Sequence, residues 1–331
     1  MRSLRRNRTP ETGPADPLER IDWLTARNRE HPDPALESAL VLARYDAFEA
    51  LAAPATAAAE VVALPGDPGP MASIGRDELT VEAIRSGLAR HGCLHVEAMF
   101  DAGVVAELVA GIDRAIDAFD RGLAGAPASE TTPWYEPFEP RPPHQVVGRA
   151  NWVRASGGCL TADSPRMLFR ICELLASSGV GQLVTDFFGE RPALSATKNT
   201  LRRVSPDADT NWHQDGAFLG AEVRSLNMWV ALTDCGDDAP GLDIVPARLD
   251  GVLAPGSGGT FDWSVGHEVA AGSSAVGVLR PRFRAGDVLF FDHLFLHRTA
   301  VEPTMTRDRH AIECWFFAPS AYPAGEIPLV Y

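Results

Sequence analysis

From about residue 193 onward, the chain consists of short apolar segments separated by Gly, Pro and Asp, and this pattern constrains the possible folds most strongly. Apolar runs of this length with turn residues between them predict strands. The predicted strands cover residues 194–204, 225–233, 242–246, 267–270, 286–292 and 308–317. Many short strands in succession favour a closed or two-layered sheet structure over a single open sheet.

Helices are predicted before these strands. Apolar residues recur at helical spacing over residues 101–121, and Gly122 is the expected end of this helix. A second helical block is predicted over residues 164–188. Helices followed by strands indicate an α+β domain, with a double-stranded β-helix (jelly-roll) core and flanking helices.

The N-terminal part differs in composition from the rest. Residues 1–20 are polar and contain proline, which predicts a loose tail, whereas residues 34–62 are rich in Ala, Leu and Glu at helical spacing. The segment Pro65-Gly-Asp-Pro-Gly-Pro70 breaks any helix and predicts a linker. We therefore divide the chain into an N-terminal extension, residues 1–74, partly helical or disordered, and a jelly-roll domain, residues 75–331.

Composition excludes several classes of function. The 331 residues include 30 Lys and Arg against 44 Asp and Glu, a net charge of −14, the opposite of a nucleic-acid-binding balance. Apolar runs stay shorter than the roughly 18 residues of a membrane span. Five widely spaced cysteines without a Cys-x-x-Cys motif argue against a disulfide framework and favour the reducing cytoplasm. Lys198 is the single lysine, and the other 29 basic residues are arginine. We attribute this preference for arginine to the composition of the genome. The sequence does not indicate an oligomeric state.

One triplet, His213-Gln214-Asp215, suggests metal chemistry. It lies in a strongly apolar segment, Trp212–Trp229. Alternate side chains along a strand share a face, so an extended triplet would point its imidazole and carboxylate the same way. Two histidines and one carboxylate hold non-haem Fe(II) and leave coordination positions open. A histidine beside an Asp cap is the alternative interpretation of the triplet.

The third ligand must come from elsewhere in the chain. His297 closes the apolar segment that begins at Gly286 and is our candidate; His293, four residues upstream, is the alternative. Arg309 follows twelve residues after His297, at the head of the last predicted strand. A guanidinium binds a carboxylate through two parallel hydrogen bonds, which favours a dicarboxylate co-substrate at Arg309. Arg307 has the same strand parity and is the second candidate.

Taken together, these segments resemble the phytanoyl-CoA dioxygenase family of Fe(II)- and 2-oxoglutarate-dependent oxygenases. The resemblance begins weakly at about Asp77 and lies in the order and spacing of Trp-His-Gln-Asp at 212–215, Leu-Asn-Met-Trp-Val-Ala-Leu at 226–232, Gly-Asp-Val-Leu-Phe-Phe-Asp at 286–292, His297-Arg-Thr and Arg309-His-Ala-Ile. Many members carry a Gly-x-Leu…Pro-Gly-Ser-His turn after the first metal strands, where this chain reads Gly241-Leu-Asp-Ile-Val-Pro246-Ala-Arg-Leu. That departure removes any analogy to a particular member's substrate.

The resemblance implies cofactors and a reaction. Fe(II) would be held by His213, Asp215 and His297, with 2-oxoglutarate and O2 as co-substrates. Related halogenases lack the carboxylate ligand, so Asp215 favours hydroxylation of a small-molecule substrate, with release of succinate and CO2. The residues expected to hold the co-substrate are Arg309, Asn227 and Thr299; for Asn227 a hydrogen bond within the sheet is equally compatible.

Two other functions stay open from the sequence. One is a non-catalytic metal-binding protein of the same fold. The other is a 2-oxoglutarate-independent, cupin-like jelly-roll enzyme, which has no need for Arg309.

The surroundings of the site are less defined by the sequence. The irregular segment 125–160 suggests a lid or substrate wall, in which Trp134-Tyr135 and Asn151-Trp152 either face the substrate or cover the end of the barrel. Lys198, Arg202 or Arg203 would attract an anionic substrate if one of them lines the mouth of the site. Solvated positions at a strand edge are the alternative for these three cations.

Overall fold

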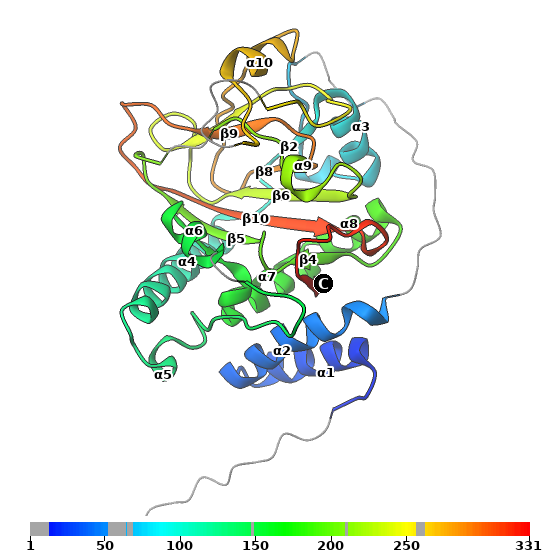
Figure 1. The fold of residues 1–331 in the computed structure, drawn as a ribbon, viewed down its shortest axis with the longest axis vertical. Coiled ribbons are helices and arrows are strands. Elements are labelled where there is room, and N and C mark those ends of the chain that lie inside the picture. Colours follow the sequence, from blue (N-terminus) through cyan, green and yellow to red (C-terminus); the bar gives the residue numbers. More distant parts are fainter. Residues whose placement is uncertain (1–12, 52–63, 65–68, 147–148, 209–210, 256–261) are drawn as a thin grey trace, which may run out of the picture.

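The strands form two sheets of unequal size (Figure 1). The computed structural model describes residues 13–51, 64, 69–146, 149–208, 211–255 and 262–331. Within these ranges, a nine-stranded sheet follows the order β1-β2-β8-β6-β10-β4-β11, with β5 also paired to β10 and β3 to β5. Its strands are β1 (Ser73–Gly75), β2 (Cys93–Glu97), β3 (Gly158–Leu160), β4 (Ala193–Ser195), β5 (Thr200–Val204), β6 (Ser225–Ala231), β8 (Val288–Phe291), β10 (Arg309–Phe317) and β11 (Pro328–Val330). The second sheet pairs β7 (Gly241–Ile244) with β9 (His297–Ala300).

Helices flank this core. They are α1 (Pro17–Glu30), α2 (Pro34–Asp46), α3 (Val81–His91), α4 (Ala102–Leu123), α5 (Ala128–Thr131), α6 (Arg149–Ala155), α7 (Pro165–Ser177), α8 (Val180–Phe188), α9 (Gly216–Leu219) and α10 (His267–Gly272), with short 3-10 turns η1 (Phe48–Ala50), η2 (Arg76–Glu78), η3 (Thr161–Asp163) and η4 (Pro319–Ala321). A large and a small sheet with helices outside them confirm the predicted α+β class with a double-stranded β-helix core.

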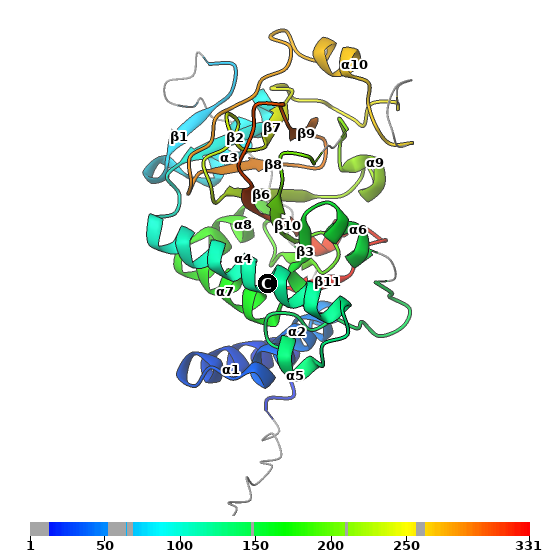
Figure 2. The same ribbon diagram turned by 90° about the vertical axis from the view of Figure 1, so that its left-hand side faces the viewer.

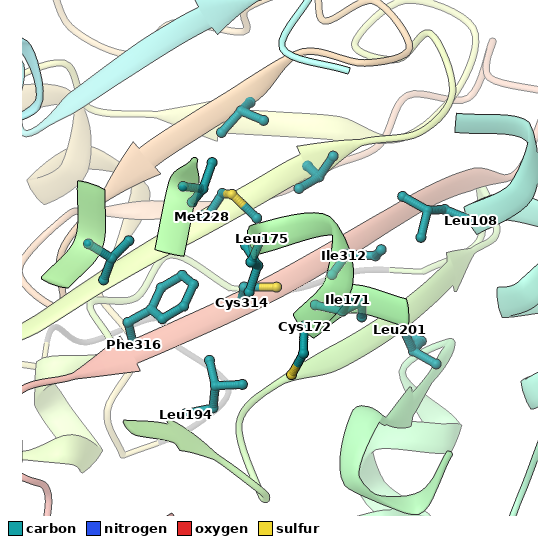
Figure 3. Close-up of a cluster of buried hydrophobic side chains, with 14 of the residues drawn as sticks. Leu108, Ile171, Cys172, Leu175, Leu194, Leu201, Met228, Ile312, Cys314 and Phe316 are labelled. Atoms are coloured by element: carbon teal, nitrogen blue, oxygen red, sulfur yellow. The ribbon is translucent and has the colours of Figure 1, made fainter. Parts of the chain in front are cut away.

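Strands β6 and β10 form the centre of the large sheet and divide its side chains between two faces. Seven residue pairs join them in antiparallel register, from Ala311 opposite Ala231 to Phe317 opposite Ser225. One face packs against α4 and α7 in an apolar cluster that Figure 3 shows. It includes Leu108, Ile171, Cys172, Leu175, Leu194, Leu201, Met228, Ile312, Cys314 and Phe316. Full burial of one large apolar side chain stabilises a fold by about 1.5–3 kcal/mol, so this cluster fixes the orientation of the sheet.

The opposite face of β6 and β10 is turned toward the small sheet. Trp229, Trp315 and Phe317 join Leu242 and Ile244 of β7 in a second apolar cluster. Because side chains alternate along a strand, Asn227 and Arg309 share this face with the tryptophans. The space between the two sheets is therefore the place where predicted site residues can meet.

Helix α4 forms where the sequence predicts it. The carboxylate of Asp101 caps its first turn by accepting from the backbone nitrogens of Gly103 at 2.9 Å and Val104 at 3.0 Å. Gly122 does not end the helix, which continues to Leu123. The second predicted block is two helices, α7 and α8, separated at Gly179, whose φ of 78° interrupts the helical path.

Helices α1 and α2 lie beyond α7, at the bottom of both Figure 1 and Figure 2. They are attached by an ion pair between Glu37 and Arg166 at 2.5 Å and by a hydrogen bond from Arg44 to the carbonyl of Val330 at 2.8 Å. The predicted loose tail over residues 1–20 is wrong from Pro17 onward, because the Asp16 carboxylate caps α1 there. Residues 1–12 and most of 52–68 lie outside the described part, and the division at residue 74 stays a prediction.

Two predicted strands differ in the structure. Residues 267–270 belong to helix α10, because Glu and Ala favour helix and four residues carry too short an alternation to define a strand. The predicted strand 194–204 is two strands, β4 and β5, joined by a turn. Asn199 holds this turn by accepting from the backbone nitrogens of Ser195 at 3.3 Å and Trp315 at 3.2 Å.

No single helix in the described ranges has the length and apolarity needed to cross a membrane. The bent pair formed by α7 and α8 passes that test by length and composition only.

Asp163 in η3 is a buried carboxyl, 2% exposed, that accepts from the backbone nitrogen of Phe138 at 2.8 Å. Burial raises the pKa of Asp163 to about 7, although the Phe138 hydrogen bond lowers it. Between pH 4 and pH 7 the folded state therefore binds more protons here than the unfolded state does. The contribution of Asp163 to the free energy of unfolding is at its maximum below the unfolded pKa of about 3.9 and is lost as pH rises through 7.

The isosteric variant Asp163→Asn should lack this pH dependence. Relative to the wild type, its free energy of unfolding should rise by about 4 kcal/mol between pH 4 and pH 8. Urea unfolding at a series of pH values measures this difference. The exposed Asp250→Asn serves as the control and should show no such slope, and parallel curves for Asp163→Asn and wild type would contradict the expectation.

Candidate metal centre

His213 and His297 are brought together by a short antiparallel bridge between their backbones. The nitrogen of His213 donates to the carbonyl of His297 at 3.0 Å, and the reverse bond is 3.1 Å long. Their ring centroids are 4.5 Å apart. Because His297 is the first residue of β9, the small sheet fixes the position of both rings.

Asp215 reaches the same point by a different route from the one predicted. Its backbone is helical, with φ −62° and ψ −25°, and it directly precedes α9. The expectation of an extended triplet is therefore wrong at Asp215: the chain turns instead of continuing as a strand. The carboxylate still lies beside the histidines, and one ligand atom from each of the three residues lies within 4.8 Å of the others.

Both imidazoles present the same nitrogen to the centre. Nδ1 of His213 donates to the carbonyl of Asn211 at 2.8 Å, and Nδ1 of His297 donates to the carbonyl of Phe295 at 3.1 Å. A carbonyl only accepts, so the proton resides on Nδ1 and the Nε2 lone pair is available. Histidine ligands to metals are commonly oriented by this kind of bond.

The protonation states also suit a metal. Burial, followed by the neighbouring His297, lowers the pKa of His213 to about 4. Burial alone would raise the pKa of Asp215, but Lys198 and the two histidines outweigh it, and the pKa falls to about 2. At neutral pH, His213 is neutral and Asp215 is ionised, as metal ligands must be.

The carboxylate of Asp215 has one satisfied and one unsatisfied oxygen. Oδ1 forms an ion pair with the ammonium of Lys198. Oδ2 is buried, has no hydrogen-bond partner among the described residues and lies 3.9 Å from Nε2 of His297. A buried charged oxygen without a partner is costly, and a cation bound between Asp215 and the two histidines would satisfy it. The residues present therefore fit a divalent metal.

Gln214 points away from the metal ligands, as expected, and holds the loop around them. Its Nε2 donates to the carbonyls of Gly251 at 3.0 Å and Leu294 at 2.6 Å, and its Oε1 accepts from the nitrogen of Leu253 at 2.7 Å. The side chain is 1% exposed. It thus ties the ligand-bearing segment to two other loops.

The variant Gln214→Leu should lose stability, because it leaves three backbone groups without their partner. We expect a loss on the order of 3 kcal/mol in the free energy of unfolding, measured by urea denaturation. The exposed Gln182→Leu is the matched control and should change stability by less than about 0.5 kcal/mol. Equal, small effects of the two changes would show that Gln214 does not hold the loop.

The metal ligands line a cavity of about 420 Å³ between the two sheets. Arg309, Asn227 and Thr299 line it as well, so all six residues predicted for the site reach one space. The Nη1 of Arg309 donates to the carbonyl of Gly241 at 2.9 Å, and its guanidinium lies 5.5 Å from the Trp229 ring centroid.

Arg309 is a buried cation without an acidic partner in the described part of the chain. Its side chain is 1% exposed, and burial lowers its pKa to about 10. Its Nε, the Oδ1 of Asn227 and the Nε1 of Trp229 are buried without hydrogen-bond partners in the described ranges. Polar groups left in this state around one cavity indicate a polar ligand, and the guanidinium makes a carboxylate the fitting one.

The alternative residues lie elsewhere. Both ring nitrogens of His293 have partners, with Nδ1 3.0 Å from Oγ of Ser225 and Nε2 3.2 Å from the carbonyl of Ala221. His293 does not line the cavity. Arg307 forms an exposed ion pair with Asp238 at 2.7 Å and also lies outside it.

Of the residues predicted to surround the site, some line the cavity and others do not. Lys198, Arg202 and Trp152 line the cavity, whereas Arg203 turns away and pairs with Asp113 at 2.9 Å. Trp134 lies among Arg114, Arg166 and Arg170, and Tyr135 stacks on Phe119; neither faces the cavity.

Sequence reasoning missed other residues that line the cavity, among them Phe218, Trp263, Glu313 and Trp315. Glu313 and Trp315 have the strand parity of Arg309, so the alternation of β10 could have identified them. Phe218 and Trp263 come from segments outside the predicted strands and left no periodic signal.

The sequence profile of the phytanoyl-CoA dioxygenase (PhyH) family matches residues 88–311. No curated protein sequence matches the chain significantly.

Similar solved structures include EctD from S. alaskensis with 2-oxoglutarate and 5-hydroxyectoine, at 19% identity over 73% of this chain and 78% of that one, with a TM-score of 0.49. The non-heme alpha ketoglutarate dependent carbocyclase SnoK from nogalamycin biosynthesis has 16% identity over 73% of this chain and 85% of that one, with a TM-score of 0.48. AviO1 from Streptomyces viridochromogenes Tue57 has 21% identity over 74% of this chain and 96% of that one, with a TM-score of 0.44. These likenesses are too distant to indicate a substrate.

Proposed function

Because this chain belongs to the phytanoyl-CoA dioxygenase family, whose members are Fe(II)- and 2-oxoglutarate-dependent oxygenases, we propose that it hydroxylates a small-molecule substrate with release of succinate and CO2. One observation carries the proposal. Asp215, whose Oδ2 has no hydrogen-bond partner in the described part of the chain, lines the same cavity as the buried guanidinium of Arg309. The first suits a metal and the second suits the far carboxylate of a dicarboxylate.

Each residue then has a defined task. The Nε2 atoms of His213 and His297 and Oδ2 of Asp215 would hold Fe(II), and Arg309 would bind the distal carboxylate of 2-oxoglutarate. Bound Fe(II) with 2-oxoglutarate supplies the means to activate O2 for attack on a C–H bond. Asn227 and Thr299 line the same cavity and would hydrogen-bond the co-substrate.

The environment supports this assignment through charge and exclusion of water. Trp229, Phe291 and Trp315 line the cavity with apolar surface. In such surroundings an ion pair between Arg309 and a carboxylate is stronger than in water. Asp215 also favours hydroxylation over halogenation, since a halide would need the coordination position that this carboxylate would occupy.

The two rival functions predict different behaviour. A 2-oxoglutarate-independent, cupin-like enzyme has no use for a buried Arg309, and a non-catalytic binding protein has no use for open metal positions.

The five cysteines are unpaired and buried, and the cytoplasm stays our prediction for the place of action.

Conversion of 2-oxoglutarate to succinate tests the proposal. Protein supplied with Fe(II), 2-oxoglutarate and air should release succinate and CO2 slowly even without its own substrate, and should not do so under nitrogen. His213→Ala protein is the control for free iron and should release neither. Iron-loaded wild-type protein that releases no more succinate than this variant would contradict the proposal.

A further inference from the structure

Lys198 occupies an unusual place for the single lysine in a chain whose other 29 basic residues are arginine. It lies in the turn between β4 and β5 and lines the candidate cavity. Its side chain is 18% exposed, and its ammonium is 4.5 Å from the Phe218 ring centroid and 5.2 Å from that of Trp315. The two rings and Asp215 hold the ammonium at the cavity wall, beside the candidate metal ligands.

The other charges of the cavity have partners, are screened by water or belong to the proposed cofactors. Arg202 lies 3.6 Å from Glu313, which also accepts from Oγ1 of Thr200 at 3.0 Å. Asp207 lines the cavity from an exposed position, where water screens its charge. Under the proposed function, Asp215 and one carboxylate of 2-oxoglutarate would offset the charge of Fe(II), and Arg309 would offset the other carboxylate.

Lys198 is then the cation left without a dedicated anion once the cofactors are in place. Its ammonium has three N–H donors, and Asp215 is its one hydrogen-bond partner among the described residues. Bound Fe(II) would draw on the charge of the Asp215 carboxylate and would so weaken the attraction between Asp215 and Lys198. A second anion beside Lys198 would restore the balance.

Aromatic side chains at the mouth of the same cavity are exposed to solvent. Trp152 in α6 is 59% exposed and Phe218 in α9 is 47% exposed, and Trp263 lies 5.7 Å from Phe218 between ring centroids. Large aromatic groups are usually more buried than this. Exposed aromatic surface at the rim of a cavity is typical of a binding site for an apolar ligand.

We propose that Lys198 binds a carboxylate of the primary substrate, and that this substrate is a small organic acid whose aromatic or apolar body lies against Trp152 and Phe218. The inference rests on the proposed function, since it takes Fe(II) and 2-oxoglutarate to be the other occupants of the cavity. Under this inference, Lys198 determines substrate specificity and does not serve to position the metal ligand Asp215.

The test compares acids with amides of the same shape. Benzoate, phenylacetate and indole-3-acetate are titrated by calorimetry into anaerobic protein loaded with Fe(II) and 2-oxoglutarate, and so are their three amides. At least one acid should bind about ten- to a hundredfold more tightly than its amide, as a charged hydrogen bond allows. Lys198→Met, of similar length but uncharged, should remove this preference by weakening the acid and leaving the amide within about twofold.

Arg203→Met is the matched control, because Arg203 is close in sequence but points out of the cavity to Asp113. It should keep the preference for the acid, and Lys198→Arg should restore part of it. Absence of any acid preference in the wild type, or a preference that survives in Lys198→Met, overturns the inference.

Two further readouts separate this inference from other roles of Lys198. Lys198→Met should bind Fe(II) at least as tightly as the wild type, because the ammonium competes with the metal for Asp215. It should also bind 2-oxoglutarate unchanged. Loss of iron would make Lys198 a positioning residue for Asp215, and weaker 2-oxoglutarate binding would make it a co-substrate ligand; either result overturns the inference. Failure of the wild type to bind 2-oxoglutarate with iron would instead contradict the proposed function.

Discussion

Replacing Asp215 with alanine is expected to abolish iron binding and, with it, all turnover of 2-oxoglutarate. Removing an outer partner of a metal ligand alone costs about 10- to 100-fold in affinity or activity, so removing the ligand itself should cost more than about 100-fold. The chain should still fold, because the large apolar clusters of the sheet do not depend on Asp215. Iron content after anaerobic loading and desalting, together with the far-ultraviolet circular dichroism spectrum, measures both expectations.

The two neighbouring histidines provide the matched pair for this experiment. His297→Gln should lose iron as Asp215→Ala does, whereas His293→Gln should keep it, because both nitrogens of His293 are engaged with Ser225 and Ala221. Iron retained by Asp215→Ala, or lost equally from both histidine variants, would contradict the assignment of the ligands.

Replacing Arg309 with alanine should raise the concentration of 2-oxoglutarate needed for half-saturation by about thirtyfold or more. Removing one partner of a buried, hydrogen-bonded charge pair costs about 2–5 kcal/mol, and each 1.4 kcal/mol is tenfold in affinity. Iron binding should be unchanged, because Arg309 is not among the grouped ligand residues. Titration of 2-oxoglutarate into iron-loaded protein, followed by the visible absorption of the chelate, gives the half-saturation value.

Arg307→Ala is the control for this prediction, since Arg307 pairs with Asp238 at the surface and should leave the half-saturation value within about twofold. Arg309→Lys keeps the charge but loses the planar fork, so it should fall between wild type and Arg309→Ala. An unchanged half-saturation value in Arg309→Ala would assign the co-substrate to another cation of the cavity.

Strand alternation made much of this site predictable. The apolar runs that became β6 and β10 fixed which residues share a face, and Arg309 came at the head of its strand as expected. The same alternation put Asn227 on the cavity side of β6. Where a residue lies inside a regular strand, the local sequence therefore predicted the face of the sheet to which its side chain points.

The sequence was less informative where the chain turns. Asp215 joins His213 through a helical backbone rather than along a strand, and only the packing of surrounding loops sets that turn. Lys198 lines the cavity because a turn at Asn199 splits a predicted strand. Hydrogen bonds from the backbones of Ser195 and Trp315 to Asn199 stabilise this turn. Such contacts join residues far apart in the chain, and no local periodicity records them.

The most direct measurement of the central claim is the anaerobic visible spectrum of metal-free wild-type protein after addition of Fe(II) and then 2-oxoglutarate. The account predicts a weak charge-transfer band that forms only when both are present and that is absent in His213→Ala. Bound iron that gives no band at saturating 2-oxoglutarate would contradict the claim and favour a jelly-roll metalloprotein that does not use this co-substrate.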